Sequence, residues 1–170
     1  MNLHIGGVEK KEGWLILNIN PGPNVDIVGD FRDNFKDKSS IFDNIYLSHV
    51  LEHTPHGETL SILAQLNKLI KPKGKIFISV PDLDHLCHFF TSPNANINDK
   101  YIAMKIMFGG QTDKNDFHYS GFNQQFLSHF LNEAGFINIQ RVHSFGLFDD
   151  TSNHYFAYQP ISLNMTAEKQ

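Results

Sequence analysis

The stretch FDNIYLSHVLEH (residues 42–53) decides how the rest of the chain is interpreted. Its first part, residues 42–48, is an apolar run of the length expected for a buried strand. Its second part carries His49, Glu52 and His53 in the order H-x-x-E-H, which supplies two metal ligands and a catalytic carboxylate in one group of zinc peptidases. The stretch is therefore either the end of a strand that turns into a helix or part of a metal site.

The zinc interpretation requires both histidines on one face of a stable helix. Pro55 disfavours the α conformation at Thr54, so we expect the helix that starts here to end after about one turn. A third ligand would have to come from further along the chain, where Glu133 is one of several available glutamates. A zinc hydrolase is kept as an alternative, but we expect no metal ion here. The cluster of histidines in HLCHFF (85–90) is also too short to predict a metal site, and no second cluster accompanies it.

The composition is typical of one soluble globular domain. The chain has 170 residues, of which 41% are hydrophobic and 19% charged, enough for a substantial core. A formal net charge of -4 argues against a surface built mainly for nucleic-acid phosphates. The single cysteine, Cys87, excludes an internal disulfide, and no apolar run has the length of a signal peptide or a membrane helix. We therefore expect a cytoplasmic protein with no nucleic-acid or membrane partner.

Apolar strands and helices follow one another along the chain. The expected strands are residues 2–5, 14–20, 25–31, 42–48, 75–81, 137–145 and 154–169. Leucines at helical spacing predict a helix over 58–70 that a turn at 71–74 ends, and a second amphipathic helix over 122–136 ends at Gly135. Apolar strands joined partly by helices predict a mainly parallel sheet covered on both faces, closed by an antiparallel pair.

Ligands bind to such sheets beyond the carboxyl ends of the strands, where the strand order reverses. The residues that directly follow the expected strands are therefore the first candidates for a site. These are Gly6-Gly7, Asn18 to Asn20, Asp30-Phe31, Ser48-His49 and Pro81-Asp82.

The ordered set of motifs resembles the class I S-adenosylmethionine-dependent methyltransferases, in a short small-molecule subgroup that lacks the usual first helix. The motifs are LHIGG (3–7), GWLILNINPG (13–22), VDIVGDF (25–31), FDNIYLSHVLEH (42–53), LIKPKGKIFISVPDLD (69–84) and FLSHFLNEAGF (126–136). The resemblance implies an α/β, Rossmann-like fold for residues 1–170: a seven-stranded, mostly parallel sheet in the order 3-2-1-4-5-7-6, with strand 7 antiparallel, flanked by helices. It implies S-adenosylmethionine-dependent methyl transfer to a small-molecule or sugar-like acceptor.

The resemblance also implies which residues bind the cofactor. Gly6 and Gly7 would let the backbone approach the methionine moiety, because no Cβ stands in the way. Asp30 would accept the adenine amino group, and Ser48 and His49 would form the floor beneath the sulfonium. The full cofactor-binding set is Ile5, Gly6, Gly7, Asn18, Ile19, Asp30, Phe31, Ser48 and His49.

Two departures from the family pattern favour an alternative function. The glycine loop, GGVEK, has two glycines where the family has three, and Asn18 stands where an acid usually binds both ribose hydroxyls. An amide offers one acceptor oxygen where a carboxylate offers two with charge assistance, a loss of roughly 1–3 kcal/mol. A methyltransferase-fold protein that has lost catalysis and serves as a binding or scaffold protein is therefore the alternative.

The stretch FGGQTDKNDFHYSGF (108–122) is the candidate for the acceptor side of the site. We expect residues 91–120 to be irregular apart from one helix around 101–108, and the region of about 85–121 to form a lid over the pocket. Methyl transfer needs a base only when the acceptor holds a proton of high pKa. The predicted base is His118.

Overall fold

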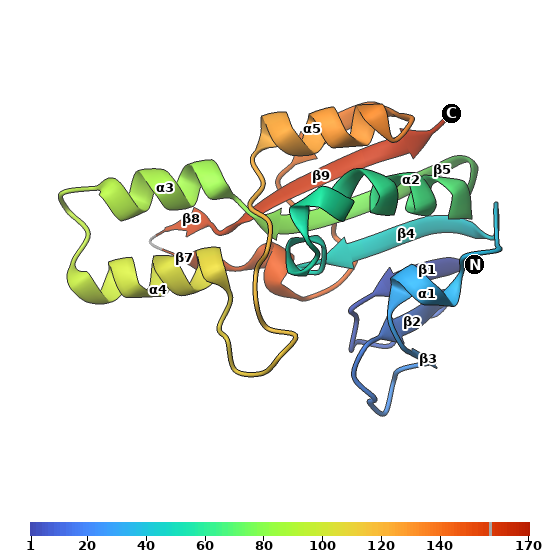
Figure 1. Ribbon diagram of the computed structural model, residues 1–170, viewed down its shortest axis with the longest axis horizontal. Helices are drawn as coiled ribbons and strands as arrows, with labels where there is room; N and C mark the ends of the chain where they lie inside the picture. The colour runs from blue at the N-terminus through green and yellow to red at the C-terminus, as the bar shows by residue number, and fades with distance from the viewer. Residues whose placement is uncertain (157) are drawn as a thin grey trace.

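A seven-stranded sheet forms the centre of the computed structural model, which describes residues 1–156 and 158–170 (Figure 1). The strand order is β3-β2-β1-β4-β5-β9-β6. The strands are β1 Asn2–Ile5, β2 Trp14–Asn18, β3 Ile27–Val28, β4 Phe42–Ser48, β5 Ile70–Pro81, β6 Phe136–Val142 and β9 Ser162–Lys169. Only β9 among them runs antiparallel to its neighbours, β5 and β6. The predicted order 3-2-1-4-5-7-6 with an antiparallel seventh strand is confirmed, because β9 is the seventh strand of this sheet.

Helices α2 (Thr59–Leu69) and α5 (Gln124–Glu133) lie side by side on one face of the sheet (Figure 1). Leu63 and Leu66 of α2 and Leu127 and Leu131 of α5 are buried in the same core cluster as the inward residues of β1, β4 and β5. The leucine spacing that predicts both helices is thus the spacing that builds the core. Gly135, with φ +86, follows the end of α5 as predicted.

An aromatic layer covers the opposite face of the sheet. His4 of β1 and Tyr46 of β4 point to this side, because neighbouring residues of a strand face opposite ways. Phe148 packs on both rings, with centroid distances of 4.1 Å to His4 and 4.9 Å to Tyr46, and Trp14 adds an edge contact at 5.1 Å from Phe148. The segment that carries Phe148 also holds the short 3-10 turn η3 (Thr151–Asn153).

Two of the expected local structures are wrong. In VDIVGDF (25–31) only Ile27–Val28 pairs as β3, because Asp30 caps the short helix α1 (Phe31–Asn34) by accepting a hydrogen bond from Arg32 N. The expected turn at 71–74 lies inside β5 instead. There the register with β4 shifts between Phe42 and Asn44, and Lys73 takes the left-handed conformation at φ +66. The Pro/Gly signal thus marks a bulge at the start of a strand.

The region after β5 is more helical than expected. HLCHFF belongs to α3 (Leu83–Thr91), and the expected helix at 101–108 begins earlier, as α4 (Ile97–Phe108). Both helices begin at a side-chain cap, Asp82 for α3 and Asn96 for α4. They pack on each other and project from one end of the sheet (Figure 1).

The expected strand over 154–169 is interrupted. Its first part forms the two-stranded ribbon of β7 (Tyr155–Phe156) and β8 (Gln159–Pro160), and only residues 162–169 enter the main sheet. Ala157, which was expected within the same strand, lies outside the described residues. The pairing of the last two long strands, β6 and β9, is antiparallel as predicted.

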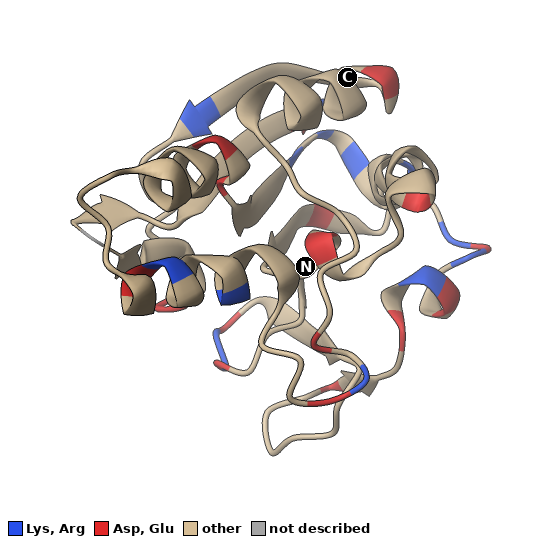
Figure 2. Cartoon of the chain, turned by 60° about the vertical axis from the view of Figure 1, so that its left-hand side comes forward, with Lys and Arg blue, Asp and Glu red and all other residues tan. Residues whose placement is uncertain are grey.

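Acidic and basic residues are interspersed over the surface, in keeping with the small net charge (Figure 2). Among the residues that the structure describes, no helix has both the length and the apolar character needed to span a bilayer.

Candidate functional site

A cavity of about 570 Å³ opens at the carboxyl ends of β1, β2 and β4. The strand order reverses here, since β1 pairs with β2 on one side and with β4 on the other. Residues after these strands form one wall, and residues 113–116 together with Tyr119 form the wall across from it. The volume lies in the range of small-molecule sites, about 300–1,000 Å³.

Most of the residues implied by the resemblance meet at this cavity. Its lining includes Ile5, Gly6, Asn18, Ile19, Asp30, Phe31 and His49. Gly7, Ser48 and His118 are outside the lining. The position of a residue in the wall does not identify what it binds, so the roles expected for these side chains stay predictions.

The two glycines after β1 meet different neighbours. Gly6 lines the cavity with φ +79, and a Cβ at this position would lie 2.5 Å from a methyl carbon of Val50. A Cβ at Gly7 would lie 2.5 Å from Nδ1 of the buried His4 ring. The structure thus requires a glycine at 7 for packing against His4, on the side away from the cavity wall.

The side-chain amide of Asn18 forms its hydrogen bonds with the turn that contains Gly6 and Gly7 and with Asn20. Its Nδ2 donates to the carbonyl oxygens of Gly6 and Gly7, each at 3.1 Å, and its Oδ1 accepts from Asn20 N at 2.9 Å. Both amide hydrogens are therefore used, and Oδ1 retains one lone pair for a ligand.

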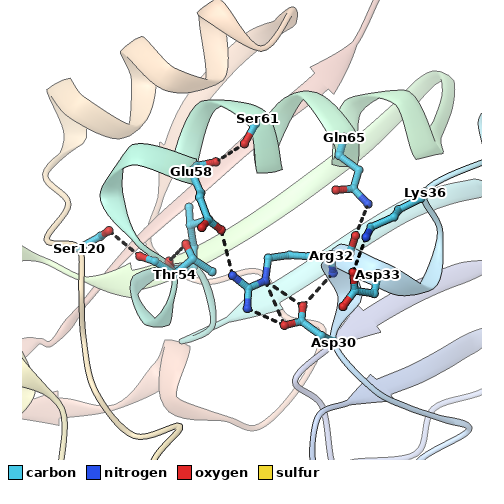
Figure 3. A network of polar contacts seen from close by, with 10 residues as sticks. Asp30, Arg32, Asp33, Lys36, Thr54, Glu58, Ser61, Gln65 and Ser120 are labelled. Carbon is cyan, nitrogen blue, oxygen red and sulfur yellow. Dashed lines mark hydrogen bonds and ion pairs between the residues drawn. The ribbon is translucent and has the colours of Figure 1, made fainter.

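Asp30 is held by Arg32 in a network that extends to Glu58 (Figure 3). The guanidinium donates from Nη2 to Asp30 Oδ2 at 2.6 Å and from Nε to both carboxylate oxygens at 3.0 Å, while Nη1 reaches Glu58 at 2.9 Å. The hydrogen bonds from Arg32 outweigh burial and hold the pKa of Asp30 below its usual value. Asp30 is thus ionised, but its acceptor sites are already shared with Arg32.

His49 links the end of β4 to β9 and to a buried carboxylate. Ser162 donates its hydroxyl hydrogen to the carbonyl of Thr151, so it can only accept from His49 Nε2, 2.8 Å away. The other ring nitrogen, Nδ1, lies 3.2 Å from Oε1 of Glu52.

Glu52 is fully buried beside three histidines. Burial raises its pKa, but the contact with His49 and the charges of His118 and His53 outweigh burial, so the pKa lies below the usual value. One ligand atom each of Glu52, His53 and His118 lies within 4.8 Å of the others, and the rings of His53 and His118 meet edge to face at 4.6 Å. Burial lowers the pKa of His118, more than the negative charge of Glu52 raises it.

This cluster differs from the H-x-x-E-H arrangement considered from sequence. His49 precedes the single 3-10 turn η1 (Leu51–His53) with φ +53, and both its ring nitrogens are already engaged. His118 takes the third place, whereas Glu133, the glutamate considered from sequence, is exposed on α5. Sequence reasoning missed the cluster because His118 follows His53 by 65 residues, and only the folded chain brings them together.

The segment that carries His118 is fastened to η1. The carbonyl of Glu52 accepts hydrogen bonds from Tyr119 N at 2.8 Å and Ser120 N at 3.2 Å, and Ser120 Oγ donates to the carbonyl of Thr54 at 2.8 Å. These bonds fix one end of the wall that faces the strand ends.

The chain is similar to methyltransferases in both sequence and structure. A sequence model described as a methyltransferase domain matches residues 7–141. A comparison with curated protein sequences gives no match.

Three solved structures illustrate the structural likeness. The 1,6-didemethyltoxoflavin-N1-methyltransferase of Burkholderia thailandensis, solved with 1,6-didemethyltoxoflavin and S-adenosylhomocysteine, superposes with a TM-score of 0.60 at 17% identity over 99% of this chain and 71% of its own. A SAM-dependent methyltransferase of Archaeoglobus fulgidus gives 0.63 at 16% identity, over 99% and 85%. Human N-acetylserotonin methyltransferase in complex with SAM gives 0.53 at 18%, over 92% and 41%. At such identities these neighbours establish the fold.

Proposed function

Because this chain belongs to the class I S-adenosylmethionine-dependent methyltransferase family, we propose that it transfers a methyl group from S-adenosylmethionine to a small-molecule acceptor. The observation that carries the proposal is the cavity at the reversal of strand order, with strand-end residues on one wall and residues 113–116 and Tyr119 on the other. The family match and the neighbours solved with S-adenosylmethionine or S-adenosylhomocysteine support this cofactor. The neighbour with bound 1,6-didemethyltoxoflavin supports a small-molecule acceptor.

We propose that the cofactor lies along the strand-end wall. Gly6 exposes backbone there, and Phe31 offers an apolar surface to the adenine ring. Oδ1 of Asn18 can accept one ribose hydroxyl, since its other lone pair is used by Asn20 N. An adenine amino group would share Asp30 with Arg32, and Arg32 keeps a second partner in Glu58.

We propose that the acceptor enters on the side of residues 113–119 and that the region of about 85–121 acts as its lid. S-adenosylmethionine supplies an electrophilic methyl group on a sulfonium centre. The protein contributes mainly by holding the acceptor in line, because correct placement alone accounts for much of the acceleration of such displacements. The predicted base, His118, stands outside the cavity lining and contacts His53, which lines the cavity.

Calorimetric titration with S-adenosylmethionine and S-adenosylhomocysteine tests the proposal. Wild-type protein is expected to bind both, and Asp30→Ala is expected to bind at least about tenfold more weakly, a difference of about 1.4 kcal/mol. Glu58→Ala is the matched control, because Glu58 is also a partner of Arg32 but stands outside the cavity lining. Equal affinities for Asp30→Ala and wild type would remove Asp30 from the site.

The alternative function, a binding or scaffold protein without catalysis, is favoured by one observation. Both amide hydrogens of Asn18 are used by Gly6 and Gly7, so the position that usually binds the ribose has little capacity left. The same titration separates the two functions. A folded wild-type protein that binds neither compound at millimolar concentration would exclude methyl transfer and leave the alternative.

A further inference from the structure

Three potential metal ligands meet beside the cavity, and one of them, His53, lines it. Ligand atoms of Glu52, His53 and His118 lie within 4.8 Å of one another. Contacts between η1 and residues 117–120 hold them there: the side-chain atom His53 Nδ1 lies 3.1 Å from Phe117 O, and Tyr119 N donates to Glu52 O at 2.8 Å. The cluster is thus part of the folded framework and does not depend on a chance approach of surface side chains.

Glu52 is a buried carboxylate with unused capacity. Its side chain is inaccessible to solvent, and none of the described residues gives either of its oxygens a well-aligned hydrogen bond. His49 Nδ1, at 3.2 Å, is its ion-pair contact, and Nδ1 of His118 is likewise buried without a described partner. Burial of a carboxylate costs several kcal/mol unless cationic or hydrogen-bonding groups surround it, so this site is suited to a further positive charge.

The surroundings orient the ligands as in known metal sites. A carbonyl oxygen only accepts, so His53 Nδ1 must carry the hydrogen of its contact with Phe117, which leaves Nε2 with a free lone pair. Histidine ligands typically donate their other ring hydrogen to a carbonyl in this way, and carboxylate ligands are typically held by a further hydrogen-bonding group. His49 occupies that second position behind Glu52.

We propose that Glu52, His53 and His118 bind a divalent transition-metal ion, with its open coordination positions facing the cavity that His53 lines. Two imidazoles and one carboxylate suit Zn²⁺, Co²⁺ or Fe²⁺, and three protein ligands are the number found in catalytic sites. Ligands about 2.1 Å from a tetrahedral ion stand about 3.4 Å apart, so ligand atoms now separated by up to 4.8 Å need to approach one another by up to about 1.4 Å.

The open coordination positions of the metal ion indicate which chemical class of acceptor could bind. An acceptor with a hydroxyl or carboxylate oxygen could complete the coordination and would then be fixed relative to the strand-end wall. This consequence rests on the proposed methyl transfer, whereas the metal site itself does not.

The test uses full-length protein freed of metal by a chelator. Calorimetric titration with Zn²⁺ and absorption spectroscopy with Co²⁺ are expected to show one ion per chain. Glu52→Gln and His118→Ala are expected to weaken binding at least tenfold. His56→Ala, which removes an exposed histidine three residues from His53, is the matched control and is expected to bind as wild type does.

A stability measurement guards against variants that fail to fold. Glu52→Gln keeps the shape of the side chain, so its metal-free form is expected to fold, which a cooperative thermal transition checks. Zn²⁺ is expected to raise the unfolding temperature of wild type and His56→Ala but not of Glu52→Gln, because an ion stabilises only a native state that binds it.

Three results would overturn the site. These are no stoichiometric binding by wild type, equal binding by Glu52→Gln and His118→Ala, or a Co²⁺ spectrum with thiolate bands that Cys87→Ser removes, which would place the ion at the exposed Cys87. Cofactor titration is independent of these outcomes. Binding of S-adenosylhomocysteine without metal binding would leave the proposed methyl transfer standing, and the reverse would leave only the metal site.

Discussion

The side-chain amide of Asn18 donates a hydrogen bond to the backbone carbonyl of Gly6 over 3.1 Å, and so ties the end of β2 to the turn after β1. Asn18 stands where the family usually has a ribose-binding acid, but its side chain is a hydrogen-bond donor that shapes the turn. Its replacement by that acid is not a simple restoration of function.

Asn18→Asp is expected to lower the free energy of unfolding by about 1–3 kcal/mol, because two hydrogen bonds are lost and a carboxylate faces two carbonyl oxygens. Urea denaturation measures the change. Asn20→Asp adds the same charge two residues away and is expected to have a much smaller effect. An Asn18→Asp protein as stable as wild type, with tighter binding of S-adenosylmethionine, would show that the turn tolerates the acid.

Gly7→Ala is expected to destabilise the protein by about 1–3 kcal/mol, because the added methyl group overlaps the buried ring of His4. Gly57→Ala is the control, since a Cβ at Gly57 meets no atom within 4 Å. Thermal unfolding of the two variants separates the overlap from the general effect of replacing glycine. Equal unfolding temperatures would mean that the His4 ring moves aside without cost.

His4 is expected to make the protein less stable as the pH falls. Burial lowers its pKa from 6.5 to about 4, only partly opposed by the charges of Asp150 and Glu9. Between these values the unfolded chain binds a proton that the native ring does not, so stability is full above pH 6.5 and decreases by up to about 1.4 kcal/mol per pH unit on the way to pH 4.

Comparison with His4→Phe isolates this contribution from that of the carboxylates. Denaturant unfolding of both proteins between pH 7 and pH 4 is expected to show a smaller loss of stability for the variant, by up to about 3 kcal/mol. Parallel curves for the two proteins would show that the native ring accepts the proton where it lies.

Tyr46→Phe is expected to cost about 1–3 kcal/mol in unfolding free energy, because the buried hydroxyl donates to the carboxylate of Asp150 at 2.8 Å. Burial raises the pKa of Tyr46, so the phenol keeps the hydrogen that it donates. Tyr158→Phe, at a side chain that is 97% exposed, is expected to change stability little. Denaturation curves of the two variants provide the measurement, and equal losses would argue against the bond to Asp150.

The fold was predictable because its signals are local and repeated. The apolar runs of β1, β4 and β5 and the leucine spacing of α2 and α5 each indicate one element, and the motif resemblance supplies their order. The start of α4 was missed although Asn96, whose side chain accepts from two backbone amides of the first turn, is a recognisable cap. The start of α3 was also missed, because the histidines and Cys87 in this segment were considered only as metal ligands. The helix is capped by Asp82, and Leu86 is its buried residue.

The candidate site was only partly predictable. Residues that follow strands, such as Gly6 and Asp30, could be placed at one edge because parallel strands end together. The hydrogen bonds that occupy Asn18 and the proximity of His118 to Glu52 depend on where loops cross in space, and no spacing in the sequence encodes them.

The antiparallel strand β9 lies between β5 and β6, so β6 leaves the ribosome before the strand that it pairs with. The nascent chain can assemble β1 to β5 with α2 as soon as these emerge, and α5 can pack on α2, while β6 has no strand partner until residues 162–169 emerge. During synthesis the edge of β5 is therefore exposed, and completion of the sheet is a late, long-range step of the kind that slows folding. A mutation in β9 would thus act on the yield of folded protein as much as on its final stability.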